Sequence, residues 1–538
     1  MANKEIKELK FEDLNLEQKI GMVMCGHIFH FWQEEVNERN LEYTLDMIRN
    51  HKLGAIWVDH TYPNLADIMA KIKEAADYPI LIFRDAESGV RDADEMLIGC
   101  HNALGTCNSV ESAYAFGKIT AIKARDMGYN VVCNPVVDMT AGNCTCGGTM
   151  RCIGSDKYRV AELAGAEAQG MHDGGVLTVG KHYPSAKGDP MIDSHMAENT
   201  SDVTKEELLD YYLYPYIELN KKGLLDGIMT GHCRLVNIDD QFPASLSKKN
   251  IDIIRDLGFE GFAITDALVM MGVVAKFGSD NSRGMAIAAG NDLALTWYFN
   301  YDGYDQLYNS YKNGFIPDEM LDAGVKRVLE AQHKVTLLKK DAVITEEDVK
   351  NFNKINTDGV YAKTDEGFDV ALPKDKKHFF VIFSQNENDI SGEGEVNVDT
   401  MAKSWYNSVH IAERLKELYP DSDSRIIREY PRSGDGYFIS EKTIDYDDIV
   451  FVTFTDVKAY VGSENFAPRV ISLFKALQIT NRISSVLHFG NPFVLEDLPH
   501  IPRIIIGGVS AKAVDAGIDV LAGKYPAKGS LTYDVKFQ

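Results

Sequence analysis

Short apolar runs alternate with longer segments of helical spacing along the first 300 residues. Each run is rich in valine, isoleucine and leucine at successive positions, which is typical of a strand that is buried on both faces of a parallel sheet. Eight strand–helix units in one stretch of chain favour a (β/α)8 barrel of the TIM type over an open doubly wound sheet. The eight runs are 21–29, 53–59, 79–85, 129–139, 175–184, 226–232, 260–266 and 291–297.

Polar side chains stand at the C-terminal end of most of these runs. In a barrel, the C-terminal strand ends meet at one mouth, where such side chains come together. Taken singly, these residues also have structural explanations, because aspartate often caps the helix that follows a strand and a lone histidine at a strand end is more often a scaffold residue than a catalyst. Together they predict a chemical site at the mouth, and the residues are Asp85, Asp138, Lys181, His182, His232 and Asp266.

The character of the chain changes after residue 335. Residues 339–377 are charged and poor in apolar runs, which indicates a linker or a helix that lies across the surface. β-rich runs with helical segments between them return at 378–384, 448–454, 483–490 and 503–508. We therefore predict three parts, an α/β barrel domain at 1–335, a linker at 336–377 and a second α/β sandwich domain at 378–538.

The charge balance excludes several classes of partner. The chain has 80 acidic and 56 basic residues and a formal charge of −24, which repels nucleic acid and anionic membranes. Its first residues are charged, and no run of about twenty residues is free of charge, so we expect no secretory signal and no membrane span. We expect a cytoplasmic protein.

The eight cysteines suit reduced thiols better than a disulfide framework. Cys144, Cys146 and Cys152 form a cluster that could hold zinc. Their spacing lacks the paired C-x2-C of structural zinc sites, and no histidine lies close in sequence. We therefore expect no metal and no other cofactor.

The stretch KHYPSAKGDPMIDSH, at 181–195, follows the fifth predicted strand and has too much proline and glycine for a helix or a strand. It places Asp193 two residues before His195. An imidazole titrates near neutrality, so it can donate a proton and take one back. The nearby carboxylate can accept a hydrogen bond from one ring nitrogen and stabilise the imidazolium.

This stretch resembles KHFPGxGxxxxDSH, a pattern of the bacterial β-N-acetylglucosaminidase branch of glycoside hydrolase family 3. The C-terminal segment GNPFVLEDLP, at 490–499, is similar to the second domain of the two-domain members. The likeness runs in order along nearly the whole chain. The other segments that carry it are RDAESGV (84–90), CNPVVDM (133–139), RCIGSD (151–156), IMTGH (228–232) and LGFEGFAITDALVMMGV (257–273).

The resemblance implies a retaining, exo-acting glycosidase that cleaves terminal β-linked N-acetylglucosamine or a related sugar. It assigns Asp266 as the nucleophile that forms a glycosyl ester, and His195 with Asp193 as the acid/base pair. Charged side chains that make paired hydrogen bonds to neighbouring hydroxyl groups suit sugar recognition. The sugar-binding residues implied by the resemblance are Asp85, Arg151, Lys181 and His182.

Three departures from the family pattern lie in the expected sugar pocket. PSAKG replaces P-G-x-G and is one residue longer, ESG replaces E-G-G, and the segment that leads to Arg91 is short. A sugar other than N-acetylglucosamine therefore stays open, as does the oligomeric state.

Three alternative functions follow from the same residues. A neutral imidazole tolerates an approaching phosphate dianion better than a second carboxylate does, so a phosphorylase that uses inorganic phosphate is one alternative. A carbohydrate-binding homologue without activity is another. A metal-dependent aldolase or amidohydrolase is disfavoured, because the strand ends lack clustered His-x-His or carboxylate ligands.

Overall fold

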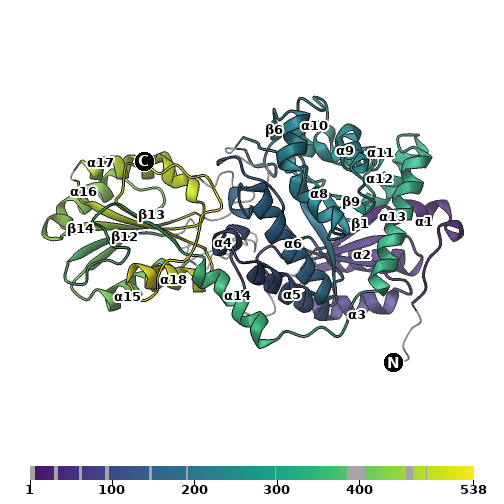
Figure 1. Cartoon of the computed structure of the whole chain (residues 1–538). Coiled ribbons are helices and arrows are strands. Elements are labelled where there is room, and N and C mark those ends of the chain that lie inside the picture. Colours follow the sequence, from purple (N-terminus) through teal and green to yellow (C-terminus); the bar gives the residue numbers. More distant parts are fainter. Residues whose placement is uncertain are drawn as a thin grey trace.

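The computed structural model describes residues 6–29, 34–59, 64–90, 96–143, 148–189, 192–296, 299–384, 406–455, 465–479 and 481–538. Figure 1 shows two α/β bodies side by side, the N-terminal one in purple to teal and the C-terminal one in green to yellow. Helix α14 (Glu346–Asp358) lies along the connection between them.

The first body is a parallel barrel, as predicted. Its strands pair in the order β10-β1-β2-β3-β4-β5-β7-β9, and a parallel bridge between Ile264 and Leu293 brings the two ends of this sheet together. Each strand lies within one of the eight predicted runs. The strands are β1 (Met24–Ile28), β2 (Ala55–Val58), β3 (Leu81–Arg84), β4 (Val131–Val132), β5 (Leu177–Tyr183), β7 (Gly227–Thr230), β9 (Phe262–Thr265) and β10 (Ala294–Leu295).

Helices surround the barrel, and their ends follow local sequence signals. The side chain of Asp156 accepts hydrogen bonds from the first backbone N–H groups of α6, and Gly175, at a φ of +95°, ends that helix. The helices are α1 (Leu16–Met22), α2 (Glu34–Arg49), α3 (Leu65–Ala75), α4 (His101–Cys107), α5 (Val110–Asp126), α6 (Lys157–Gly174), α7 (Lys205–Glu207), α8 (Tyr214–Lys221), α9 (Lys248–Asp256), α10 (Met271–Phe277), α11 (Ser279–Ala288), α12 (Asn300–Lys312) and α13 (Asp318–Thr336). A short parallel pair, β6 (Thr200–Ser201) and β8 (Arg234–Leu235), lies outside the barrel sheet.

The barrel interior is filled by apolar side chains, among them Phe83 of β3, Val179 of β5 and Ile264 of β9. Side chains of a strand alternate between its two faces. The residues two positions further along these strands are Asp85, Lys181 and Asp266. The strand pattern that packs the interior therefore also delivers polar groups to its C-terminal mouth.

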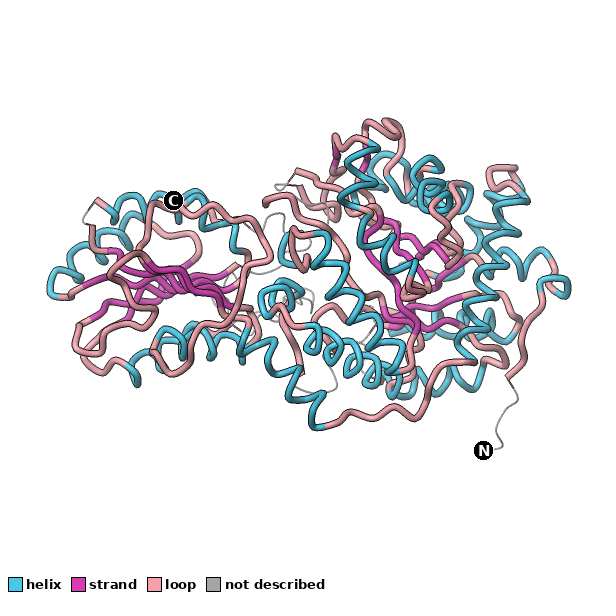
Figure 2. The backbone as a smooth tube through the Cα atoms, in the orientation of Figure 1, coloured by secondary structure: helices cyan, strands magenta, loops and turns pink. Residues whose placement is uncertain are grey.

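The second body is an open sheet in the order β11-β16-β15-β14-β12-β13, parallel except for β11. Figure 2 shows its strands as a layer with helices above and below, so the predicted α/β sandwich is confirmed. Its elements are β11 (Tyr361–Thr364), β12 (His378–Ser384), α15 (Ser408–Leu418), β13 (Asp423–Arg428), α16 (Ser433–Lys442), β14 (Asp448–Phe454), α17 (Pro468–Gln478), β15 (Ile483–Phe489), β16 (Arg503–Gly507) and α18 (Ala511–Leu521).

Two strands of this sheet were not predicted. Strand β13 is an edge strand with polar residues, and only Ile427 in it is buried. Strand β11 lies within the range predicted as a linker and pairs antiparallel with β16. The domain boundaries at residues 335 and 378 stay a prediction.

Three properties expected of the whole chain concern membranes, thiols and metals. Within the described ranges, no helix is both long and apolar enough to cross a bilayer. The described cysteines, which include Cys152, form no disulfide bond with one another. Cys144 and Cys146 lie outside the described residues, and the part of the chain that is described holds no group of three or more side chains arranged as metal ligands.

Candidate active site

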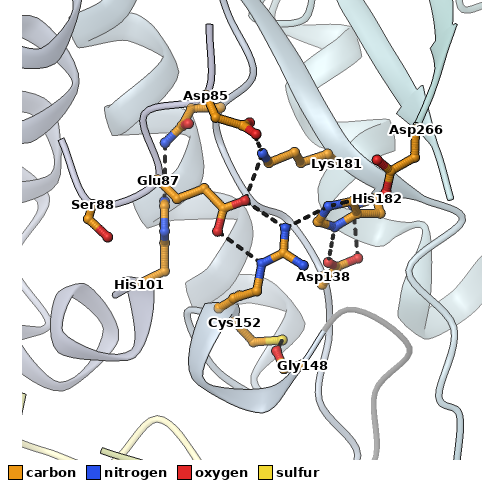
Figure 3. A network of polar contacts seen from close by, with 12 residues as sticks. Asp85, Glu87, Ser88, His101, Asp138, Gly148, Cys152, Lys181, His182 and Asp266 are labelled. Carbon is orange, nitrogen blue, oxygen red and sulfur yellow. Dashed lines mark hydrogen bonds and ion pairs between the residues drawn. The ribbon is translucent and has the colours of Figure 1, made fainter. Parts of the chain in front are cut away.

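Asp266 follows β9 at the mouth of the barrel, and its side chain is 22% exposed. Its Oδ1 accepts a hydrogen bond of 2.7 Å from the backbone N–H of Ala267, and its own N–H donates to the carbonyl of Thr230 at 2.9 Å. Its Oδ2 lies 4.0 Å from Nε2 of His182. Figure 3 shows this carboxylate at the edge of a polar network that fills the mouth.

The surroundings of Asp266 keep it ionised. Burial alone would raise its pKa, but the imidazoles of His182, His232 and His195 and the N–H of Ala267 lower the pKa of Asp266 from 3.8 to about 2. Positive charge on a nearby imidazole stabilises the ionised carboxylate and opposes its protonation. With a pKa of about 2, the carboxylate of Asp266 is ionised at neutral pH.

His182 is held in one tautomer by two neighbours. Its Nδ1 lies 2.7 Å from Oδ2 of Asp138, whose Oδ1 accepts the backbone N–H of His182 at 3.0 Å. Its Nε2 lies 2.8 Å from a terminal nitrogen of Arg151. Because a guanidinium only donates hydrogen bonds, we assign Nε2 as the acceptor and place the ring proton on Nδ1, where it is donated to Asp138.

Glu87 joins the two cations of the site. Arg151 donates to both of its oxygens, through Nε at 2.9 Å and a terminal nitrogen at 2.6 Å, and Nζ of Lys181 lies 2.7 Å from Oε1. Lys181 also contacts Asp85. Burial alone would raise the pKa of Glu87, but Arg151 and Lys181 hold it well below its ordinary value. Within the network of Figure 3, Asp85 and Glu87 thus pair with Lys181 and Arg151.

His195 and Asp193 form a second acid–imidazole pair. Nδ1 of His195 lies 2.6 Å from Oδ1 of Asp193, which also accepts the backbone N–H of His195 at 2.9 Å. The carbonyl of His195 accepts from the N–H of Met271 at 3.2 Å, and that of Ser194 accepts from Gly272 at 3.0 Å. The loop therefore rests on the start of α10, the helix that follows Asp266.

Gly272 permits this close approach. A Cβ atom at this position would lie 2.8 Å from the carbonyl oxygen of Ser194 and 3.0 Å from that of Ala197. Any larger residue would push the loop away from α10. His195 lies near enough for its charge to act on both Asp266 and His232.

His232 supports the backbone next to Asp266. It is buried, with Nδ1 2.8 Å from Oγ of Ser245 and Nε2 3.0 Å from the carbonyl oxygen of Ala267. Since a carbonyl only accepts, Nε2 carries the proton. Burial lowers the pKa of His232 and favours the neutral ring.

The structure brings the residues predicted from sequence into one mouth. One connected network contains Asp85, Arg151, Lys181, His182 and Asp266, and the pair of Asp193 and His195 lies beside it. Sequence reasoning missed Glu87, although it stands two positions after Asp85. A signal was present, because Glu87 lies within RDAESGV (84–90), one of the segments that carry the family resemblance.

A comparison with protein families identifies the barrel. Residues 16–331 match the glycosyl hydrolase family 3 N terminal domain. The chain belongs to glycosyl hydrolase family 3. Like other members, this family 3 protein is a glycoside hydrolase enzyme.

This family 3 enzyme is similar to several named proteins and solved structures. It is similar to a beta-hexosaminidase of Tolumonas auensis, with 30% identity over 245 residues that cover 44% of this chain and 72% of that protein. Its fold matches a family 3 beta-N-acetylglucosaminidase from Paenibacillus sp. str. FPU-7 with a TM-score of 0.77 and 23% identity, over 98% of this chain and 100% of that one. It also matches the beta-glucoside phosphorylase BglX, with a TM-score of 0.78 and 21% identity, over 97% and 95%. These two structures, both below 25% identity, establish the two-domain fold.

Proposed function

We propose that this family 3 enzyme is a retaining, exo-acting β-N-acetylglucosaminidase, which cleaves terminal β-linked N-acetylglucosamine or a related sugar. The observation that carries the proposal is the ionised Asp266, surrounded by imidazoles at the mouth beside a cluster of paired charged side chains. The relatives named beta-hexosaminidase support this class of substrate.

In the first step, an oxygen of Asp266 attacks the anomeric carbon while the bond to the leaving oxygen breaks. His195 donates its proton to that leaving oxygen, and Asp193 stabilises the orientation of the ring. The product is a glycosyl ester on Asp266 and a released alcohol.

In the second step, His195 takes a proton from water, and the water oxygen attacks the anomeric carbon. The ester bond breaks and Asp266 leaves as a carboxylate. Each step inverts the anomeric carbon, so the product keeps the β configuration. The low pKa of Asp266 favours its departure as an anion.

Four charged or polar residues would hold the sugar ring: Asp85, Arg151, Lys181 and His182. The contacts of Glu87 with both cations, and of Asp138 with His182, fix these side chains before a substrate arrives. Such preorganisation lowers the ordering cost of binding and holds the reacting carbon near the nucleophile.

A panel of p-nitrophenyl glycosides tests the proposal. We expect the N-acetyl-β-glucosaminide to be cleaved fastest, with the β anomer appearing first by NMR. Asp266→Asn should lose activity, whereas Asp252→Asn, which removes an exposed carboxylate on α9, should keep it. An α anomer as first product, or an active Asp266→Asn, would refute the mechanism, and no turnover of any glycoside would favour a carbohydrate-binding homologue.

Phosphate in place of water is a second candidate acceptor. Each of the carboxylates Glu87, Asp138 and Asp193 contacts a cation or an imidazole, so an incoming phosphate dianion meets less uncompensated negative charge than at a free acid/base carboxylate. Measuring sugar 1-phosphate against free sugar at increasing phosphate tests this candidate. The absence of sugar phosphate at high phosphate would exclude it.

A further inference from the structure

Arg151 is the last residue of a single 3₁₀ turn, η2 (Thr149–Arg151), in the segment that follows β4. Within the turn, the N–H of Arg151 donates to Gly148 at 3.2 Å and that of Cys152 to Thr149 at 3.1 Å. So short a turn has little stability of its own. What holds the backbone of this turn in place must therefore come from neighbouring parts of the chain.

On the N-terminal side of Arg151, the turn is linked to the second domain through Asn143. Oδ1 of Asn143 accepts hydrogen bonds from Oγ1 of Thr149 at 3.1 Å and from Nδ2 of Asn491 at 3.0 Å. Asn491 is fully buried two residues after the end of β15, and its Oδ1 already accepts the N–H of Phe493 at 3.1 Å. Its amide nitrogen is therefore the group that faces the barrel.

On the C-terminal side, the last segment of the chain holds the backbone. The hydroxyl of Tyr533 donates to the carbonyl of Cys152 at 2.5 Å, and Oγ1 of Thr532 donates to that of Ile153 at 2.6 Å. The N–H of Ser155 donates to the carbonyl of Thr532 at 2.7 Å.

The side chain of Met150 packs the same turn into the second domain. It is fully buried and belongs to the apolar cluster formed by the second sheet and its helices. Arg151, one residue further, directs its guanidinium the other way, to Glu87 and His182. The residues on both sides of Arg151 are thus held by the second domain, while its guanidinium contacts side chains of the barrel.

We propose that the second domain positions Arg151 for substrate binding, with Asn491 and Tyr533 as its positioning residues. This inference rests on the proposed role of Arg151 in holding the sugar. Because Arg151 contacts His182, which lies 4.0 Å from Asp266, a shift of the turn alters both the sugar contact and the group beside the nucleophile. A misplacement of about 1 Å at such a site costs about 100-fold in rate.

A double-mutant cycle tests the inference. We expect Asn491→Ala to lower kcat/KM for an activated aryl glycoside by at least about tenfold, and to have no further effect when Arg151 is already alanine. Tyr533→Phe, which removes one hydroxyl, should behave in the same way if Asn491→Ala does not fold. The inference is overturned if Asn491→Ala lowers kcat/KM by the same factor in the wild-type protein and in Arg151→Ala. It is also overturned if the single variants Asn491→Ala and Tyr533→Phe leave kcat/KM unchanged.

Asn102→Ala is the matched control. Asn102 is a buried asparagine of α4 whose side chain also crosses the domain boundary, because its Nδ2 donates to the carbonyl of Gly490 at 3.0 Å. It lies outside the Arg151 turn, so we expect kcat/KM within about twofold of wild type. A loss equal to that of Asn491→Ala would assign the effect to domain contact in general and refute the positioning role.

Hydrogen exchange separates this inference from the proposed function, because it needs no substrate. We expect faster exchange of the backbone amides of 148–156 in Asn491→Ala and Tyr533→Phe than in wild type and Asn102→Ala. Equal exchange in all four proteins would overturn the inference. A wild-type protein that cleaves no glycoside would instead refute the proposed function.

Discussion

Replacing Glu87 by glutamine tests the charge balance of the site. The wild-type carboxylate accepts two hydrogen bonds from Arg151 and forms an ion pair with Lys181. Glutamine keeps the shape but carries an NH2 group, which donates and cannot accept from these cations. With the amide oxygen at the position of Oε1, one contact to each cation remains, but the hydrogen bond from Nε of Arg151 is lost and both cations lose the negative charge beside them.

The size of the effect follows from the contacts that are lost. A hydrogen bond to a charged group contributes about 1.5–3 kcal/mol, and breaking a buried ion pair costs about 3–5 kcal/mol. Asp85 still contacts Lys181, so we take the lower end of the range for a buried ion pair. We expect the free energy of unfolding to fall by about 3 kcal/mol, and kcat/KM to fall about 100-fold because both sugar-binding cations move.

Thermal unfolding and steady-state kinetics on the best glycoside measure these two effects. Glu218→Gln is the control, because Glu218 makes an exposed pair with Lys221 on α8, and surface pairs contribute about 0–1 kcal/mol. If Glu87→Gln keeps kcat/KM within about threefold of wild type, the cluster does not orient the substrate and the reasoning fails.

Three further predictions concern the acid/base pair, the pH dependence and the loop. His195→Asn should lower kcat by about 10²–10⁴-fold for a substrate with a poor leaving group. The loss should be much smaller for a dinitrophenyl glycoside, because dinitrophenolate leaves without a proton. Kinetic assays that show equal losses of kcat for the two substrates would contradict this role. Because the pKa of Asp266 is depressed to about 2, its contribution to folding stability is present above its ordinary value of 3.8 and is lost as pH falls through about 2. If kcat/KM falls at acidic pH with a midpoint above about pH 4, protonation of a group other than Asp266 must cause the fall. A pH profile in which Asp266 itself is protonated above about pH 4 would disprove the assignment. Gly272→Ala should displace the carbonyl of Ser194 and lower kcat about tenfold, whereas Gly434→Ala, with open space around its Cβ, should not.

The barrel could be predicted from sequence because its strands are buried on both faces and therefore apolar throughout. The residues at strand ends could also be predicted, since Asp85, Lys181 and Asp266 continue the inward alternation of β3, β5 and β9. Strand β13 could not, because an edge strand with exposed polar residues lacks that pattern.

The contacts around the sugar-binding residues were beyond sequence reasoning. Glu87 lies in a loop without periodicity, so the direction of its side chain is set by the tertiary structure alone. Asn143 and Asn491 are 348 residues apart in sequence. No local pattern relates two such positions, and their contact depends on how the second domain packs on the mouth.

Covalent trapping tests the central claim most directly. A fluorinated N-acetylglucosaminyl fluoride, which forms the glycosyl ester quickly and releases it slowly, should inactivate the enzyme in a time-dependent way. Peptide mass mapping should then find the sugar on Asp266. A label on any other carboxylate would contradict the account.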